Sequence, residues 1–323
     1  MTATASRVEQ PVRQRRTVTV SAAARYAAPI GLLIVFVIFF IATPDFLTVA
    51  NISDLLVSAS ILALLSMGQQ LVVTVAGIDL SVGANLPWAA ALLGFAVTHG
   101  WALSAAIVLA ILGGGVIGLV NGILVAKLNM TDFIVTLGSL SVVSGLTLLL
   151  TRGNTVSVDS GFLRGLALDG IGPVRWFWLV ALVAALLVGF LLFRTRTGTH
   201  LLATGGNIDA ARGSGINVAR MRLLAYLGSG LFAGLAGVLL VARTGGADPS
   251  LQTELLLSSI AAVVLGGSSL FGGRASVLGS VTGAVLLQSL INGFTLIGIS
   301  QYYQPIAVGG VVLGAAFLSR FQK

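Results

Sequence analysis

Long apolar runs dominate this 323-residue chain and decide what it can fold into. An α-helix needs about 20 predominantly apolar residues to cross a bilayer, or somewhat fewer where neighbouring helices shelter irregular backbone. Only 9% of the residues are charged, whereas a soluble domain carries about 25%, so the chain lacks a surface suited to water on all sides. We therefore predict an all-α polytopic membrane protein with about ten transmembrane helices. The expected spans cover residues 27–43, 52–76, 83–98, 102–126, 132–151, 176–193, 221–242, 254–271, 276–297 and 304–319.

The basic residues test this number of spans. With the N-terminus inside, 14 of the 18 Lys and Arg residues fall in inside segments and 4 fall outside. Inside loops of membrane proteins carry the excess of Lys and Arg, so the pattern predicts ten spans and cytoplasmic termini. The net charge of +8 is explained by this topology rather than by a nucleic-acid partner. We expect a cytoplasmic N-terminal tail over residues 1–26 and a single transmembrane domain over residues 27–320, with its longest inside loop at 194–220.

Several kinds of chemistry are missing from the sequence. It has no cysteine, and no Gly-x-x-x-x-Gly-Lys-Ser/Thr loop that would cradle the phosphates of ATP. His99 and His200 fall in short loops on opposite sides, so they cannot share a metal. We therefore predict no catalytic residue, no metal site and no cofactor in this chain, which is not expected to be an enzyme.

The segment Gly77–Gly83 lies between the second and third expected spans and contains Asp79. Its glycines predict a broken-helix region, followed by a helix that starts near Leu80. In one interpretation Asp79 caps that helix by accepting its free backbone amides. In the other it takes part in gating or cargo passage, because transporters expose backbone to a polar pathway at such breaks. The acids Asp132 and Glu254 are expected at span ends, where water reaches them.

Neutral polar and aromatic side chains inside the spans favour a neutral solute, because a polyhydroxylated cargo needs uncharged hydrogen-bond partners and aromatic faces. The alternative is that each of these side chains bonds one helix to the next. Gln69 and Gln70 belong to this polar set. The candidates for the translocation pathway and its gate are Gly77, Asp79, Ser81, Gly83, Asn85, Trp88, Asn121, Thr136, Gln288, Asn292 and Phe294.

The longest inside loop carries the signature of a short helix. Asn207 is a good N-cap, Asp209 suits the positive end of a helix, and Gly213 or Gly215 can end it. We predict a helix outside the membrane over about Ile208–Arg212. The pattern alone leaves open whether this helix is a simple connector.

Four motifs, in order along the chain, carry a resemblance to a known family. They are Gly77-Ile-Asp-Leu-Ser-Val-Gly83, Asn121-Gly122 with the run 133–138, the segment 206–216, and the glycine-rich stretch 264–273. Over residues 30–318 the chain resembles permease subunits of bacterial ribose, xylose, arabinose and galactoside importers. These belong to the binding-protein-dependent ABC family that also contains branched-chain amino acid permeases. The first motif points to the sugar branch.

The resemblance implies a membrane-spanning permease of an ATP-driven importer for a small sugar such as a pentose or hexose. It implies a periplasmic or extracellular binding protein that delivers the sugar, a cytoplasmic ATPase that binds ATP and Mg, a second permease in a homodimer or heterodimer, and a bacterial inner-membrane location. The loop 194–220 is similar to the family's coupling segment, whose short helix docks on the ATPase. The implied coupling residues are Gly205, Gly206, Asn207, Asp209, Ala210, Ala211, Gly213, Gly215 and Ile216. The alternatives are another small solute, such as a nucleoside, a polyol or a signalling sugar derivative, or a secondary transporter.

Overall fold

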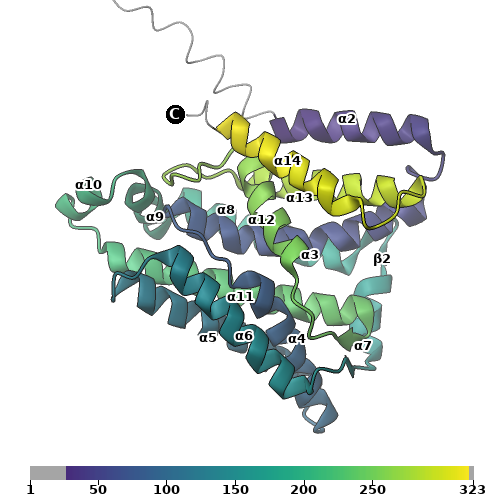
Figure 1. Ribbon diagram of the computed structural model, residues 1–323, viewed down its shortest axis with the longest axis horizontal. Coiled ribbons are helices and arrows are strands. Elements are labelled where there is room, and N and C mark those ends of the chain that lie inside the picture. The colour runs from purple at the N-terminus through teal and green to yellow at the C-terminus, as the bar shows by residue number, and fades with distance from the viewer. Residues whose placement is uncertain (1–26, 320–323) are drawn as a thin grey trace, which may run out of the picture.

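A computed structural model describes residues 27–319 and shows a bundle of helices (Figure 1). The expected tail over residues 1–26 lies outside the described residues. Each expected span corresponds to one helix. These helices are α2 (Ala27–Ala42), α3 (Val49–Thr74), α4 (Val82–Thr98), α5 (Leu103–Ala126), α6 (Asp132–Thr151), α8 (Trp176–Arg194), α11 (Val218–Thr244), α12 (Thr253–Leu265), α13 (Val277–Leu296) and α14 (Gln304–Ser319).

Length and apolar composition separate these helices into two groups. Within the described part of the chain, 6 helices are long and apolar enough to cross a membrane, namely α3, α5, α6, α8, α11 and α13. Their outward-facing side chains are apolar, as Leu149 and Leu186 show with 77% and 72% of their surface exposed. An apolar exterior is what lipid requires, so the prediction of a polytopic helical membrane protein is confirmed.

Shorter elements lie at the two ends of the bundle, and the sequence predicted few of them. One end carries α7 (Gly161–Leu168) and the strands β1 (Val156–Ser157), β2 (Gly170–Ile171), β3 (Val174–Arg175) and β4 (Gly246–Ala247). The other end carries α9 (Arg196–Gly206) and α10 (Ile208–Gly213) (Figure 1). Strand β1 pairs antiparallel with β4, and β2 pairs with β3. Strands of two residues are too short for a periodic pattern, so they were not predicted from the sequence.

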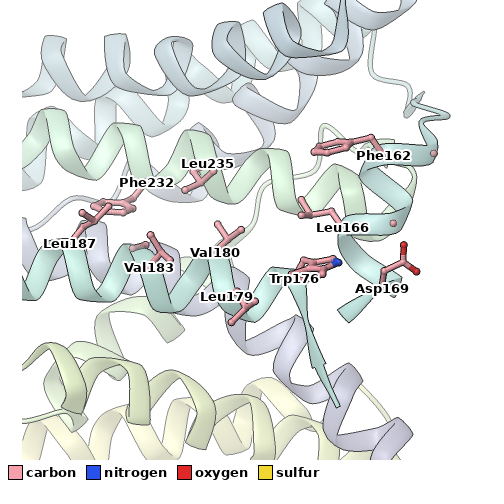
Figure 2. Close-up of a pocket in the computed structure, with 13 residues that line it drawn as sticks. Phe162, Leu166, Asp169, Trp176, Leu179, Val180, Val183, Leu187, Phe232 and Leu235 are labelled. Carbon is pink, nitrogen blue, oxygen red and sulfur yellow. The ribbon is translucent and has the colours of Figure 1, made fainter. Parts of the chain in front are cut away.

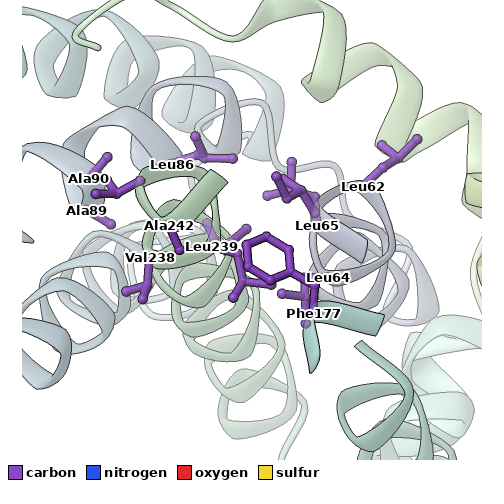
Figure 3. Close-up of a cluster of buried hydrophobic side chains, with 14 of the residues drawn as sticks. Leu62, Leu64, Leu65, Leu86, Ala89, Ala90, Phe177, Val238, Leu239 and Ala242 are labelled. Carbon is purple, nitrogen blue, oxygen red and sulfur yellow. The ribbon is translucent and has the colours of Figure 1, made fainter. Parts of the chain in front are cut away.

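Helix α11 runs through the bundle and packs against α5, α3 and α4. Glycines permit this packing: a Cβ added to Gly114 of α5 would lie 2.5 Å from the carbonyl oxygen of Gly230 and 2.9 Å from Gly234 of α11. Small residues one turn apart let the two backbones touch, which replaces the hydrophobic driving force that is absent in lipid. Leu64, Leu86 and neighbouring buried residues pack around α11 and form the main apolar core (Figure 3).

Four apolar helices within residues 27–319 are too short to cross a bilayer core of about 30 Å while standing upright, and α2 and α14 are two of them, with 16 residues each. Helix α4 has 17 residues and α12 has 13, which correspond to about 25 Å and 20 Å. The span expected over residues 254–271 was wrong at its end. The helix stops at Leu265, and the chain turns through Gly267, Gly272 and Gly273, which all have positive φ. Only glycine adopts this backbone without strain, so the apolar run continues as a turn instead of a helix.

Candidate functional site

Asp79 lies at the break between α3 and α4 and is completely buried. Its Oδ1 accepts hydrogen bonds from the Ser81 amide (3.0 Å) and the Ser81 hydroxyl (2.6 Å), and its Oδ2 accepts one from the Ser229 hydroxyl of α11 (2.7 Å). The helix that follows begins at Val82 rather than near Leu80. Asp79 therefore organises the turn that leads into α4, and it does not cap the free amides of the first helical turn.

Other side chains extend this buried cluster across three helices. The Asn121 side chain donates to the Ser81 hydroxyl (2.9 Å) and accepts from the Ser139 hydroxyl (2.6 Å). The Gln69 side chain donates to the carbonyl of Asp79 (2.5 Å). These bonds fix the break from α3, α5 and α6, so the irregular backbone does not depend on water for its partners.

Ile78, inside the break, is held by side chains of α6 and α11. Its amide donates to the Asp132 carboxylate of α6 (2.8 Å), and its carbonyl accepts from the Tyr226 hydroxyl (3.3 Å). The Thr136 hydroxyl is 3.5 Å from the same carbonyl and 2.9 Å from the carbonyl of Asp132. The structure thus brings Asp79, Ser81, Asn121 and Thr136 together. Gln69, which belongs to the polar set named from the sequence, joins them, and the members of the cluster that the sequence analysis missed as site residues are Asp132, Ser139, Tyr226 and Ser229.

The remaining candidates near the break face neighbouring helices. The Asn85 side chain donates to the carbonyl of Gly114 (3.1 Å), whereas its oxygen has no partner within residues 27–319. Gly77 lies under the Tyr226 hydroxyl, since an added Cβ would be 2.8 Å from it. Gly83 faces α12, and Trp88 is half-buried against α5.

Three candidates on α13 lie apart from this cluster. Asn292 and Asn51 exchange two side-chain hydrogen bonds of 2.8 Å and 3.0 Å. Phe294 packs edge-to-face on Phe39, with ring centroids 5.7 Å apart. Gln288 is half-buried and forms no hydrogen bond within the described chain. The contacts of Asn292 and Phe294 are those expected of residues that hold α13 to α3 and α2.

A helix occupies the residues where a short helix was expected outside the membrane. In α10 the Asn207 side chain caps the Ala210 amide at 2.9 Å. At the other end the Ile216 amide bonds to the carbonyl of Ala211 (3.0 Å), and Gly215 has a φ of +79°. This is a Schellman ending with glycine in the left-handed position, as one of the two expected stops predicted.

Helix α9 lies between α10 and the C-terminal end of α3, which directly precedes the break. Gly205 is buried, and a Cβ added there would collide with the carbonyl oxygen of Thr74 and lie 2.7 Å from the amide of Gly273. The Gly273 amide donates to that same Thr74 carbonyl (3.1 Å). Deeper in the bundle, Gln70 accepts hydrogen bonds from Ser268 (2.7 Å) and Ser280 (2.8 Å). The end of α9, the end of α3 and the glycine-rich turn therefore meet at one junction.

A cavity of about 730 Å³ lies between α7, α8 and α11 (Figure 2). Phe162, Trp176 and Val180 contribute to walls that are almost wholly apolar. None of its lining residues belongs to the cluster around Asp79, so the cavity lies outside the candidate site.

The chain matches the family model described as a branched-chain amino acid transport system permease component over residues 51–318. It is 37% identical over 320 residues to the ribose import permease protein RbsC of Escherichia coli (strain K12), covering 96% of this chain and 98% of that protein. It is 35% identical over 300 residues to the D-allose transport system permease protein AlsC of the same strain, covering 92% and 91% of the two chains. The chain belongs to this family of ABC importer permeases.

A third relative of the permease is the galactose/methyl galactoside import permease protein MglC of Salmonella typhimurium, 35% identical over 308 residues, with 89% of this chain and 91% of that protein covered. No solved structure matches the permease. Family membership makes it a membrane-embedded transport subunit rather than an enzyme, and it implies an ATPase and a binding protein as partners.

Proposed function

We propose that this permease is the membrane-spanning subunit of an ATP-driven importer for a small sugar such as a pentose or hexose. The observation that carries the proposal is its similarity, over nearly the full length of both chains, to permeases named for ribose, allose and galactosides. The neutral polar groups inside the bundle support an uncharged cargo. A nucleoside, a polyol or a signalling sugar derivative is the competing cargo.

We further propose that α2, α4, α12 and α14 complete ten spans together with the six long helices. Strands β1 and β4, which pair, would then lie outside, and α9 and α10 would lie in the cytoplasm with both termini. The excess of basic residues in the proposed inside segments supports this orientation. The membrane would be the bacterial inner membrane, and the binding protein would deliver the sugar to the outer face.

Helix α10 is the element that we propose docks on the ATPase, which would bind ATP and Mg while this chain holds no cofactor. Asp209 and Ala210 are exposed on α10, whereas Ala211 is buried. A displacement of α10 would pass through Gly205 and Gly206 to the end of α3, and so to the break at Gly77–Gly83. At that junction backbone atoms pack directly on backbone atoms, so α9 and the end of α3 have little room to move independently.

The experiment is reconstitution of the permease with its ATPase and binding protein in liposomes. ATP-dependent uptake of labelled ribose, allose, arabinose or galactose is expected, and uptake without the ATPase would favour a secondary transporter. Uptake of a nucleoside alone would overturn the sugar assignment. The double variant Asp209→Arg with Ala210→Trp changes only exposed positions of α10, so it should insert normally yet lose the ATPase on purification. Normal uptake by that variant would remove the docking role.

A further inference from the structure

The start of α12 carries an acidic side chain that the function proposed above does not use. Glu254 lies in the first turn of α12, where a carboxylate is compatible with the helix dipole. The sequence placed it at the end of a full span, within reach of bulk water. The structure places it elsewhere, because α12 begins partway through the bundle.

Hydrogen bonds fix the depth of this helix start. The Gln252 amide, two residues before Glu254, donates to the carbonyl of Gly83 (3.0 Å). Half a turn further along α4, Asn85 donates to the carbonyl of Gly114, which lies halfway along the 24-residue helix α5. Glu254 is therefore close to the middle of the bilayer.

The chain reaches this depth as an extended segment. At the outer end β4 pairs with β1, and a Cβ on Gly94 of α4 would touch both Val156 and Ala247. Asp248 then accepts hydrogen bonds from the Ser250 amide (2.8 Å) and hydroxyl (2.6 Å), which lower the pKa of its carboxyl group below the ordinary value. The segment follows α4 inward and ends where α12 begins.

Glu254 is exposed at this depth and has no hydrogen bond or ion pair to any residue between 27 and 319. Beside it is a cavity of about 450 Å³ between α12 and α14. The other lining residues are Thr253, Leu257, Pro305, Val308, Gly309 and Leu313. A carboxylate against lipid chains is costly, and acidic groups inside membranes face water-filled cavities or partners. The open face of α12 and α14 is therefore unsuited to lipid near Glu254.

We propose that Glu254 contacts the transported sugar in a water-filled pathway, which the α12–α14 face and a second copy of this chain enclose. A carboxylate accepts hydrogen bonds from two neighbouring hydroxyls of a sugar ring, and the Thr253 hydroxyl adds a further partner. The apolar walls at Leu257, Val308 and Leu313 suit contact with helices of the second copy, which would shield Glu254 from lipid. This inference rests on the proposed function, since it names a residue that meets the cargo.

Accessibility to a water-soluble thiol reagent tests the pathway directly, because the chain has no cysteine. Glu254→Cys is made in the full complex with ATPase and binding protein, and the mass of this chain is followed during treatment with a charged, membrane-impermeant methanethiosulfonate. Leu112→Cys is the matched control, since Leu112 is 56% exposed on α5 two residues from Gly114. We expect modification at position 254, no modification at 112, and slower modification at 254 in the presence of the best transported sugar.

Each other result overturns part of the inference. A thiol at 254 that is as unreactive as the control overturns the water-filled pathway. Modification that the sugar does not slow overturns the contact with the cargo. A photoreactive benzoylphenylalanine at Leu313 should capture a second, differently tagged permease copy, whereas one at Leu112 should not. Capture of lipid alone at Leu313 overturns the second copy as the other wall.

Uptake measurements separate this inference from the proposed function. Glu254→Gln should lower sugar uptake about tenfold through loss of one charge-assisted hydrogen bond, and Glu254→Asp should recover part of it. ATP hydrolysis without sugar should not change. A wild-type complex that takes up no sugar overturns the proposed function, whereas wild-type uptake with an unaffected Glu254→Gln variant overturns only the role of Glu254.

Discussion

Two helix starts lie inside the bundle, and their carboxylates have opposite environments. At the start of α4, Asp79 is fully buried and accepts three hydrogen bonds from Ser81 and Ser229. At the start of α12, Glu254 is exposed and has no partner within the described chain. The two starts touch, because Gln252 bonds to Gly83. Depth alone therefore does not explain the difference between the two acids.

The difference lies in whether the surrounding residues satisfy the carboxylate. A buried acid whose oxygens are all bonded has fixed a local structure, and it offers nothing further to a ligand. An acid without partners at membrane depth keeps its bonding capacity for water, a solute or another chain. We call the break before α4, where Asp79 has all its hydrogen-bond partners, the closed joint. We call the start of α12, where Glu254 has none within the described chain, the open joint.

The largest effect is expected from Asp79→Ala, which tests the closed joint. It removes the acceptor of three hydrogen bonds and leaves buried hydroxyl and amide groups unsatisfied, so we expect a loss of about 3 kcal/mol or more in stability. Asp79→Asn retains one acceptor oxygen and can donate to Ser229, so its loss should be about 1 kcal/mol. Thermal unfolding of the purified permease in lipid nanodiscs measures both. An Asp79→Ala variant that melts with the wild type would show that the cluster does not hold the joint.

The next effect tests whether the closed joint is connected to α10. Gly205→Ala forces a Cβ against the Thr74 carbonyl at the foot of α3, and overpacking of this kind costs about 1–3 kcal/mol. Gly145→Ala in α6 is the matched control, because Gly145 is exposed and nothing lies within 4 Å of its added Cβ. Stability and ATP-driven uptake should both fall for Gly205→Ala alone. Equal behaviour of the two variants would remove the junction from the proposed route of coupling.

The sequence predicted local features of this molecule well. Each of the ten ranges chosen by hydropathy contains one helix, because a long apolar run in such a chain folds as a helix. The cap at Asn207 was also readable, since a cap needs only its own next few residues. The apolar run over 254–271 was read as too long a helix, because it stays apolar through the glycines that end α12.

The candidate site was predictable only in part, because its contacts join distant segments. The motif around Asp79 indicated the break, but its partner Ser229 is 150 residues away along the chain. Asn292 has the same polar character as Asn121, yet it pairs with Asn51 in the first turn of α3, far along the helix from Gln69. The depth of Glu254 depends on the bond between Gln252 and Gly83, which no local pattern reveals.

A smaller effect extends the comparison to two amides on α13. Asn292→Leu removes both hydrogen bonds to Asn51 and leaves the Asn51 side-chain oxygen without its partner, while the Asn51 amide still donates to the carbonyl of Phe46, so the change should cost about 1 kcal/mol. Gln288→Leu, one turn earlier, removes a half-buried side chain that has no bond in the described chain, so stability should change by less than about 0.5 kcal/mol. The melting temperatures of the two variants measure this difference. Equal losses would mean that Gln288 has a structural partner, for example in a second copy.

The smallest change in stability is expected at the open joint itself. Glu254→Ala removes no hydrogen bond or ion pair within residues 27–319, and the Glu254 side chain is exposed. The free energy of unfolding of the isolated permease, obtained from its melting curve, should therefore stay within about 0.5 kcal/mol of wild type. The same variant should lose most of its sugar uptake in the full complex. A loss of stability as large as that of Asp79→Ala would mean that Glu254 is also a structural acid. In that case Asp79 and Glu254 would both hold the fold and would differ only in how exposed they are. The exposure of Glu254 would then no longer be a reason to place it in contact with the sugar.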